Sequence, residues 1–234
     1  MDNSIVERRF ADMAALQAAA VETIKSSILA GIAARGTASL ALSGGTTPVL
    51  IYQALSHLDL PWSQVQLTLT DERWVPTDDP ASNEAMVRRT LLRGPAAAAR
   101  FTGLKCATAT PQEAEVQIDA ALRTLTQPFD LVILGMGDDA HTASLFPGAA
   151  GLPAAMDLDS PQKARAVRPV GDGPDRLSLT LPALLQSRHI LLLLKGPTKW
   201  AVYQEARRAG SALEAPVRAI LHQDQVPVTV FWGP

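Results

Sequence analysis

The chain has 234 residues, of which 47% are hydrophobic and 19% charged, and its 21 Lys and Arg against 23 Asp and Glu give a formal net charge of -2. This composition excludes a disordered chain, and the near balance of charge excludes the basic footprint of a nucleic-acid-binding protein. The single cysteine, Cys106, excludes an internal disulfide and a cysteine-based metal cluster. No apolar run approaches the ~20 residues that cross a bilayer, so we expect a cytoplasmic protein with neither a membrane nor a nucleic acid as partner.

The N-terminal segment carries Arg8 and Arg9 followed by Phe10, a pattern that resembles the start of a twin-arginine export signal. An export signal requires an apolar stretch after such a pair, whereas polar residues, beginning with Asp12, interrupt this segment. Apolar residues instead recur at helical intervals. This spacing predicts a long amphipathic helix over residues 10–34.

The next elements alternate between strands and helices. Residues 39–43 form a short apolar run that predicts a buried strand, and a glycine pair ends it. A helix is expected over residues 46–58, with a proline in its first turn, where a missing N–H costs least. Residues 65–70 alternate and are β-branched, which predicts a strand ending at Asp71.

The middle of the chain continues the alternation. Residues 82–92 predict a helix, and the alanine-rich residues 95–99 predict a surface loop. Thr110, followed by a proline and then by Glu113, is a capping box that opens a helix to residue 125. Residues 129–135 are a continuous apolar run between turn residues, the strongest strand signal in the chain.

Shorter elements complete the chain. Strands are expected over residues 165–169, 176–180, 189–194 and 226–232, and helices over residues 182–187 and 197–208. Apolar strands that alternate with helices predict an α/β fold with an open, mostly parallel sheet and helices on both faces, Rossmann-like in architecture. We expect one domain over residues 1–234.

Ligands of open parallel sheets bind beyond the carboxyl ends of the strands, so the loops there are candidate sites. The first such loop comprises Ser43, Gly44, Gly45, Thr46 and Thr47. Its glycines allow close approach to the backbone, and its hydroxyls and the N–H groups of the helix start form an anion site of the size of a phosphate. It is neither a Walker loop nor a dinucleotide fingerprint, and a tight strand-to-helix turn is the alternative interpretation.

Charged residues lie after two other predicted strands and at the start of a third. Asp71 is placed to act as a base or to orient a hydroxyl, and Arg73 to clamp an oxyanion, although a surface ion pair would explain both. Arg176 begins a strand, and Lys199 lies in the first turn of a helix. A lysine there is unfavourable to the helix dipole, so an anionic ligand or plain solvation must compensate it.

The strongest strand is followed by a turn that contains Asp139 and His141. An imidazole with an unperturbed pKa near 6.5 is a suitable general base, and a neighbouring carboxylate fixes its tautomer. A capping or surface histidine is the alternative. His57, His189 and His222 lack metal-ligand spacing, so we expect no metal and no cofactor.

Three segments carry a resemblance to a known family: residues 43–48 (SGGTTP), residues 71–76 (DERWVP) with Ser82 and Asn83 downstream, and residues 134–148 (LGMG through HTASLFPG). In this order they resemble 6-phosphogluconolactonases, over nearly the whole chain. The first segment is shared with glucosamine-6-phosphate deaminases of the same fold. The third is highly specific.

The third segment also departs from the family pattern. Asp138 and Ala140 stand where that pattern usually has a proline and a glycine, whereas Asp139 and His141 are retained. Alanine resists the positive φ that a glycine adopts readily, so we expect Ala140 to matter for the shape of this turn.

The resemblance implies hydrolysis of 6-phospho-D-glucono-1,5-lactone, the second step of the oxidative pentose phosphate pathway, without a cofactor. It further implies that His141 deprotonates the attacking water and that Asp139 orients the imidazole. The loop at residues 43–47 would hold the 6-phosphate. Arg73, Arg176 and Lys199 would then serve as countercharges to the phosphate or would stabilise the oxyanion, and the sequence leaves this choice open.

Two alternatives differ in class. A deaminase acting on glucosamine 6-phosphate usually has a glutamate soon after the histidine, but residues 142–147 contain no acid, and Arg73 stands where a deaminase usually has tyrosine. A sugar-phosphate sensor usually carries a DNA-binding segment ahead of this fold, and we expect no room for one before residue 39. The oligomeric state is left open.

Overall fold

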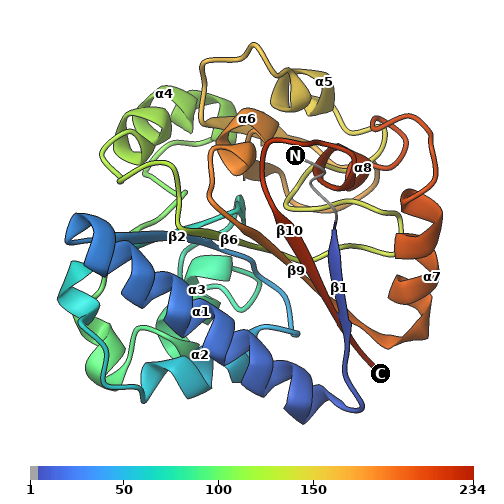
Figure 1. Cartoon of the computed structure of the whole chain (residues 1–234). Coiled ribbons are helices and arrows are strands. Elements are labelled where there is room, and N and C mark those ends of the chain that lie inside the picture. Colours follow the sequence, from blue (N-terminus) through green and yellow to red (C-terminus); the bar gives the residue numbers. More distant parts are fainter. Residues whose placement is uncertain (1–4) are drawn as a thin grey trace.

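The computed structural model describes residues 5–234, which form two β-sheets surrounded by helices (Figure 1). The larger sheet has seven strands, and every neighbouring pair in it is parallel. From edge to edge its strands are β1 (Val6–Arg9), β10 (Val228–Gly233), β9 (Ile190–Lys195), β6 (Leu131–Leu134), β2 (Ala38–Leu42), β3 (Val65–Leu69) and β5 (Arg100–Thr102).

A smaller antiparallel sheet lies beside the carboxyl ends of the large one. It consists of β4 (Asp71–Arg73), β8 (Arg176–Leu179) and β7 (Ala164–Val167), with β8 in the middle. The register places Arg73 opposite Arg176. Because β4 follows β3 after one residue, the small sheet carries charged side chains directly to the end of the large sheet.

Eight α-helices and two short 3₁₀ segments connect the strands of the described region. The helices are α1 (Met13–Arg35), α2 (Val49–Ser56), α3 (Asn83–Thr90), α4 (Pro111–Leu122), α5 (Leu152–Met156), α6 (Leu181–Leu185), α7 (Gly196–Ala206) and α8 (Arg218–Leu221). The α1 and α2 helices pack against each other over one side of the sheet, while α7 lies apart from them next to β9 and β10 (Figure 1). The sheet is therefore covered on both faces, as the sequence predicted.

The long helix α1 shows why the sequence folds locally as it does. Asp12 caps its first turn by accepting a hydrogen bond from the Ala15 N–H at 2.8 Å. Gly36 ends it with a φ of 74°, a left-handed conformation that suits glycine. Its fully buried stripe against the sheet, including Leu16 and Ile24, follows the apolar spacing of the sequence.

The core is densest at the middle of the large sheet. Every residue of β2 and β6 is buried, and β9 is buried up to its last residue. Such strands lose water on both faces and therefore form rigid supports. Each loop that follows these strands therefore begins at a fixed position, which limits where the side chains of the loop can lie.

The structure confirms the predicted helices and strands and adds elements that the sequence analysis missed. The segment predicted as a surface loop is largely a 3₁₀ helix, residues 94–98, in which Ala96 is fully buried. The β5 strand follows it directly. The N-terminal helix begins at Met13, and the arginine pair before it lies in β1, whose partner β10 closes the chain. Strands of three or four residues at sheet edges have too few residues for a periodic signal.

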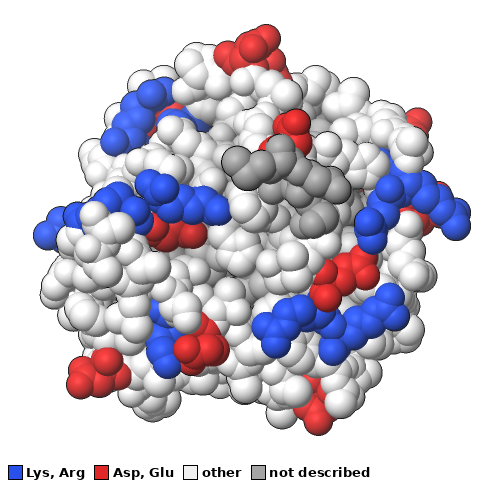
Figure 2. Space-filling view, in the orientation of Figure 1, with Lys and Arg blue, Asp and Glu red and all other residues white. Residues whose placement is uncertain are grey.

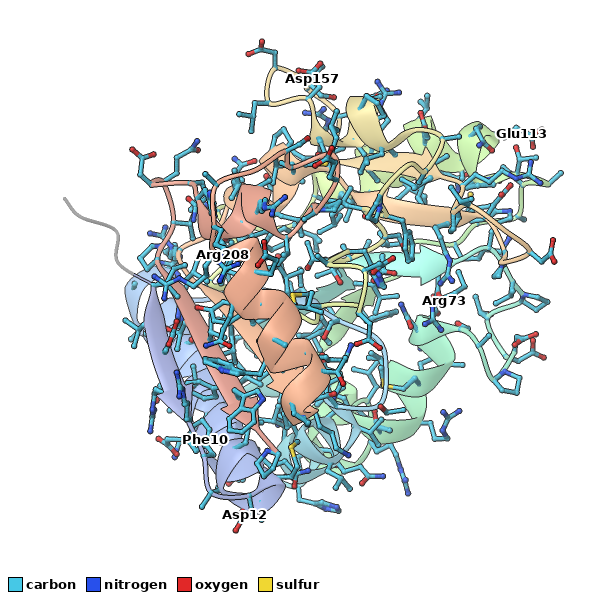
Figure 3. All side chains as sticks on the ribbon, turned by 90° about the vertical axis from the view of Figure 1, so that its right-hand side faces the viewer. Phe10, Asp12, Arg73, Glu113, Asp157 and Arg208 are labelled. Atoms are coloured by element: carbon cyan, nitrogen blue, oxygen red, sulfur yellow. The ribbon has the colours of Figure 1, made fainter. Side chains whose placement is uncertain are left out.

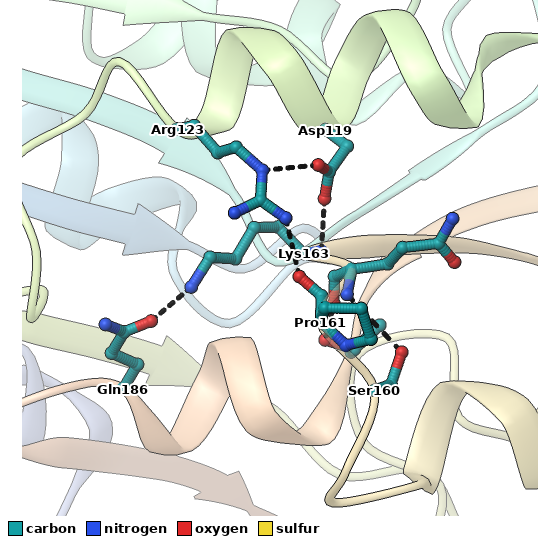
Figure 4. A network of polar contacts seen from close by, with 8 residues as sticks. Asp119, Arg123, Ser160, Pro161, Lys163 and Gln186 are labelled. Carbon is teal, nitrogen blue, oxygen red and sulfur yellow. Dashed lines mark hydrogen bonds and ion pairs between the residues drawn. The ribbon is translucent and has the colours of Figure 1, made fainter.

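A polar network ties the small sheet to α4 (Figure 4). Asp119 accepts hydrogen bonds from Arg123 Nε at 2.6 Å and from the Lys163 backbone N–H at 2.5 Å. The Lys163 ammonium donates to Gln186, which follows α6. Burial, and then the charge of Arg123, lowers the pKa of Lys163. These contacts fix β7, and through it β8, against the rest of the fold.

The surface of the described residues carries both signs of charge. Lys and Arg side chains alternate with Asp and Glu on the face shown in Figure 2. None of the helices in residues 5–234 combines the length and the apolar character needed to span a membrane.

Candidate active site

A cavity of about 340 Å³ opens where β2, β3, β6 and β9 end. It is lined by all of the predicted substrate-binding residues and by His141; Asp139 lies just behind the histidine. The lining comprises Ser43, Gly44, Gly45, Thr46, Thr47, Pro48, Thr70, Asp71, Arg73, Asn83, Gly135, Met136, Gly137, His141, Ala143, Phe146, Arg176, Leu193 and Lys199. The fold thus brings the four separate predicted loops to one place, although their roles remain predictions.

The first wall of the cavity is the loop between β2 and α2. Neither the backbone N–H groups of residues 44–47 nor the hydroxyls of Ser43, Thr46 and Thr47 donate a hydrogen bond within residues 5–234. Gly45 turns the chain with a φ of 87°. The α2 helix, which begins two residues after this loop, adds the positive end of its dipole. Such a set of unpaired donors is suited to an anion.

The neighbouring α3 helix shapes this loop. A Cβ atom on Gly44 would lie 1.9 Å from Asn83 Oδ1, so a side chain cannot be placed there. The Asn83 amide donates to the Asp71 carbonyl at 2.8 Å. Asn83 therefore joins the anion loop to the end of β3, a link that the sequence analysis did not assign to the site.

His141 and Asp139, which the sequence predicts as a catalytic pair, are in direct contact in the structure. His141 Nδ1 and Asp139 Oδ1 are 2.5 Å apart, and the same carboxylate oxygen accepts the His141 backbone N–H at 3.1 Å. A Cβ on Gly137 would lie 2.1 Å from His141 Nδ1, so glycine is required beneath the pair. Burial alone would raise the pKa of Asp139. The charge of His141 and the hydrogen bonds from its backbone and ring nitrogens have the larger combined effect, so the pKa of Asp139 is lowered. The aspartate is thus held as a carboxylate.

The turn that carries the pair contains an unusual backbone. Ala140 has a φ of 63°, in the left-handed region that favours glycine. Its carbonyl accepts a hydrogen bond from the Val217 N–H at 3.0 Å, and its own N–H donates to Gly137 at 3.1 Å. The sequence left the conformation of this turn open, and the structure shows that alanine occupies a positive-φ position beside His141 and Asp139.

Phe146 forms the floor beneath the histidine. The two ring centroids are 4.1 Å apart and the planes are inclined by 37°. With Nδ1 on Asp139, the other ring nitrogen, Nε2, is left for a water or a substrate. Phe146 belongs to the third of the resembling segments, but nothing in the sequence distinguished it from an ordinary core residue.

Asp71 is buried at the edge of the cavity. Its Oδ2 accepts a hydrogen bond from the Ser144 hydroxyl at 2.6 Å, and its Oδ1 lies 3.3 Å from the Thr70 hydroxyl. The carboxylate retains acceptor capacity on Oδ1, which suits a sugar hydroxyl. Ser144 is itself fully buried, and its contact with Asp71 links residues far apart in sequence.

Two arginines lie across the same end of the cavity. Arg73, labelled in Figure 3 far from Phe10 and Asp12, donates from Nη1 to the Ala81 carbonyl at 2.5 Å. Its cross-strand neighbour is Arg176. The Nε–H groups of both are buried without an acceptor among the described residues. Burial, and then the charge of Arg73, lowers the pKa of Arg176.

Lys199 contributes a third cation from α7. Its ammonium donates to the Met136 carbonyl and lies 3.7 Å from an oxygen of Asp138. It therefore rests on the loop that precedes His141. Its position in the first turn of the helix is explained by these acceptors even without a ligand.

Behind β4, a second carboxylate shapes the site without touching the cavity. Glu72 is 1% exposed and accepts hydrogen bonds from the N–H groups of Arg73, Asn83 and Glu84 at 2.7 Å each. Burial raises the pKa of Glu72, and these hydrogen bonds oppose the shift. The sequence does not show that Glu72 supports the site in this way, because its role depends on contacts with the backbone of α3 and not on a motif.

The described residues contain no cluster of three or more His, Cys, Asp or Glu side chains arranged to hold a metal ion. Taken together, the fold and the cavity define an α/β protein with a cavity suited to a small anion beside a His–Asp pair. Residues 11–232 match the family described as glucosamine-6-phosphate isomerases/6-phosphogluconolactonase. The chain belongs to this family.

Individual relatives are similar over most of their length. A 6-phosphogluconolactonase of Rhizobium meliloti is 39% identical over 225 residues, which cover 96% of this chain and 97% of the relative. A crystal structure of a 6-phosphogluconolactonase from Shewanella baltica superposes with a TM-score of 0.95 at 39% identity, covering 98% of this chain and 97% of that one. A monomeric glucosamine-6-phosphate deaminase shares the fold, with a TM-score of 0.80 at 17% identity and coverage of 97% of each chain.

Proposed function

We propose that this protein hydrolyses 6-phospho-D-glucono-1,5-lactone to 6-phospho-D-gluconate and thereby acts in the oxidative pentose phosphate pathway. The observation that carries this proposal is the His141–Asp139 pair, 2.5 Å apart, at a cavity lined with unpaired anion donors. Relatives at about 40% identity that are named 6-phosphogluconolactonase support the choice of substrate.

The geometry suggests a simple mechanism. His141 Nε2 removes a proton from a water molecule as the water oxygen attacks C1 of the lactone. The carbonyl electrons move to its oxygen, and the resulting oxyanion is stabilised by nearby cations. When the carbonyl re-forms, the bond between C1 and the ring oxygen breaks, and the imidazolium returns the proton to that oxygen. The carboxylic acid formed at C1 then loses its proton to solvent, which gives the carboxylate product. Asp139 keeps the imidazole oriented throughout. General-base catalysis of the kind assigned to His141 contributes roughly 10²- to 10⁴-fold.

The 6-phosphate fits the loop at residues 43–47. This loop offers backbone N–H groups and hydroxyls that have no partner within residues 5–234, beside the start of α2. Tetrahedral oxyanions are commonly held by such donors. The cations Arg73, Arg176 and Lys199 line the same cavity and balance the charge of the substrate.

The structure gives less support to a deaminase. No acidic side chain follows the histidine within residues 142–147, and its ring lies on Phe146 instead. The carboxylate partner of His141 comes from the preceding side, at Asp139. A lactone is an activated ester, and one base with an oxyanion stabiliser is sufficient to hydrolyse it.

We also propose that residues 1–234 act as one domain in the cytoplasm. The first and last strands of the described region, β1 and β10, are neighbours in the same sheet, so separating the ends of the chain would disrupt it. The single cysteine suits a reducing compartment.

The proposal is tested with freshly prepared 6-phosphogluconolactone in a pH-stat, after subtraction of spontaneous hydrolysis. We expect the protein to accelerate lactone opening and to release no ammonia from glucosamine 6-phosphate. Ammonia release without lactone opening would show that the protein is a deaminase. Binding of sugar phosphates without either reaction would support the sensor.

A further inference from the structure

The cavity contains two sets of anion donors on different elements. The loop at residues 43–47 follows β2 and presents uncharged donors. Arg73 and Arg176 belong to the small antiparallel sheet and are directly opposite each other in its register. Two separate sets of donors suit a ligand with two anionic groups rather than one.

Arg73 and Arg176 each have a guanidinium Nε–H group that lacks a hydrogen-bond acceptor in the described part of the chain. Both Nε–H groups are buried, and no atom of residues 5–234 accepts them. The two like charges are neighbours across the register, and the nearby carboxylates of Asp71 and Glu72 act on Arg176 in the opposite direction. An anion placed between the guanidinium groups would provide the missing acceptor and reduce their repulsion.

Phe146 connects this pair to the general base. Its ring centroid lies 4.1 Å from that of His141 and 5.7 Å from the Arg176 guanidinium carbon. The base and the guanidinium group therefore approach the same aromatic ring. His141, Phe146 and Arg176 all line the cavity, so a carbonyl group attacked by a water on His141 shares this cavity with the Arg176 guanidinium group. The loop at residues 43–47 reaches the cavity from a different strand, β2.

We propose that Arg176, with Arg73 beside it, binds the C1 oxygens of the sugar: the oxyanion during water attack and the carboxylate of the product afterwards. The phosphate is left to the loop at residues 43–47. This assignment rests on the proposed function. The sequence alone left open whether the cations bind the phosphate or stabilise the oxyanion, and the assignment gives the oxyanion to Arg176 and Arg73. A guanidinium matches a planar carboxylate with two parallel hydrogen bonds, so the same residue serves both states.

One consequence concerns the product. It would be held at both ends, by its phosphate and by its new carboxylate, so it should bind more tightly than a sugar phosphate without the carboxylate. Glucitol 6-phosphate is a suitable comparison, because it has a hydroxymethyl group at C1 and otherwise matches open-chain 6-phosphogluconate.

The test measures both dissociation constants by calorimetry for the wild type and for Arg176→Gln. Arg168→Gln is the matched control, because Arg168 lies on the same hairpin, is 71% exposed and pairs with Asp175 at 3.4 Å outside the cavity lining. We expect the wild type to prefer 6-phosphogluconate by at least ~10-fold, since hydrogen bonds to charged groups have that strength. Arg176→Gln should abolish this preference and leave glucitol 6-phosphate binding nearly unchanged, and the control should change neither.

Kinetics provide a second readout. Loss of an oxyanion donor should lower kcat by roughly 10²-fold in Arg176→Gln with little change in KM. Equal weakening of both ligands, or a rise in KM at constant kcat, would show that Arg176 holds the phosphate and would overturn the inference. A wild type that binds the two ligands equally would overturn it without any variant. A wild type that binds neither ligand would instead contradict the proposed function.

Discussion

Replacement of Ala140 by glycine tests the structural account of the catalytic turn. This residue adopts a φ of 63° and is 6% exposed. A left-handed conformation costs an L-residue about 1–2 kcal/mol, and glycine would remove that cost. Glycine would also add about 0.4–1 kcal/mol of unfolded-state entropy and would lose a buried methyl group worth about 0.8 kcal/mol. These contributions nearly cancel, so we expect Ala140→Gly to leave the free energy of unfolding almost unchanged.

A matched control isolates the strain. Ala166 in β7 is also 6% exposed, and its φ is not positive. Ala166→Gly loses the same methyl group and gains the same chain entropy but relieves no strain, so it should destabilise the fold by about 1–2 kcal/mol. The difference between the two variants measures the strain at Ala140, about 1–2 kcal/mol.

The assay is urea unfolding followed by circular dichroism, with the two variants and the wild type compared at equal m-values. Equal destabilisation by Ala140→Gly and Ala166→Gly would mean that the turn is unstrained. The reasoning from backbone conformation would then be refuted.

The remaining predictions concern residues around the same cavity. Asp139→Asn should lower kcat by roughly 10²- to 10⁴-fold, because the imidazole loses its orienting carboxylate. The pKa of Asp139 lies below its ordinary value of 3.8, so the carboxylate is ionised throughout the neutral range and its contribution is lost only as the pH falls through that lowered pKa. A variant with wild-type kcat at about pH 7–8 would contradict this. Gly44→Ala should raise KM at least ~10-fold, because its Cβ would lie 1.9 Å from Asn83 Oδ1 and displace the anion loop. The double variant Gly44→Ala, Asn83→Gly should recover part of the lost affinity. An unchanged KM in Gly44→Ala alone would show that the loop is not packed closely against Asn83. Glu72→Gln should destabilise the fold by about 2–4 kcal/mol, because an amide nitrogen would face donors that now bond to a carboxylate oxygen. Since the folded pKa of Glu72 is raised above 4.5, the wild type should lose stability as the pH rises from that value through the folded pKa, and denaturation curves of the variant should lack this slope.

The sequence was most informative where several signals coincided. The strand now seen as β6 is a pure apolar run followed by a turn rich in glycine and acid, so both the element and the adjacent His141 could be predicted. The loop of glycines and hydroxyls after β2 was predicted for the same reason. The convergence of these loops followed from the rule that parallel strands end at one edge.

Other features depend on contacts that local patterns do not contain. The small antiparallel sheet pairs residues about 100 positions apart, such as Arg73 and Arg176, and nothing in either segment specifies its partner. Phe146 and Asn83 act through the side chains they touch, and Glu72 faces away from the cavity. Burial against distant residues decides such roles, and it becomes visible only in three dimensions.

The most direct test of the central claim compares lactone hydrolysis by the wild type and by His141→Ala, which removes the group placed to activate water. The rate is followed by pH-stat on freshly generated 6-phosphogluconolactone, with spontaneous opening subtracted and calorimetric binding of 6-phosphogluconate measured in parallel. We expect kcat to fall by at least ~10²-fold while the product still binds. Full activity in His141→Ala would contradict the account, because another group would then have to activate the water.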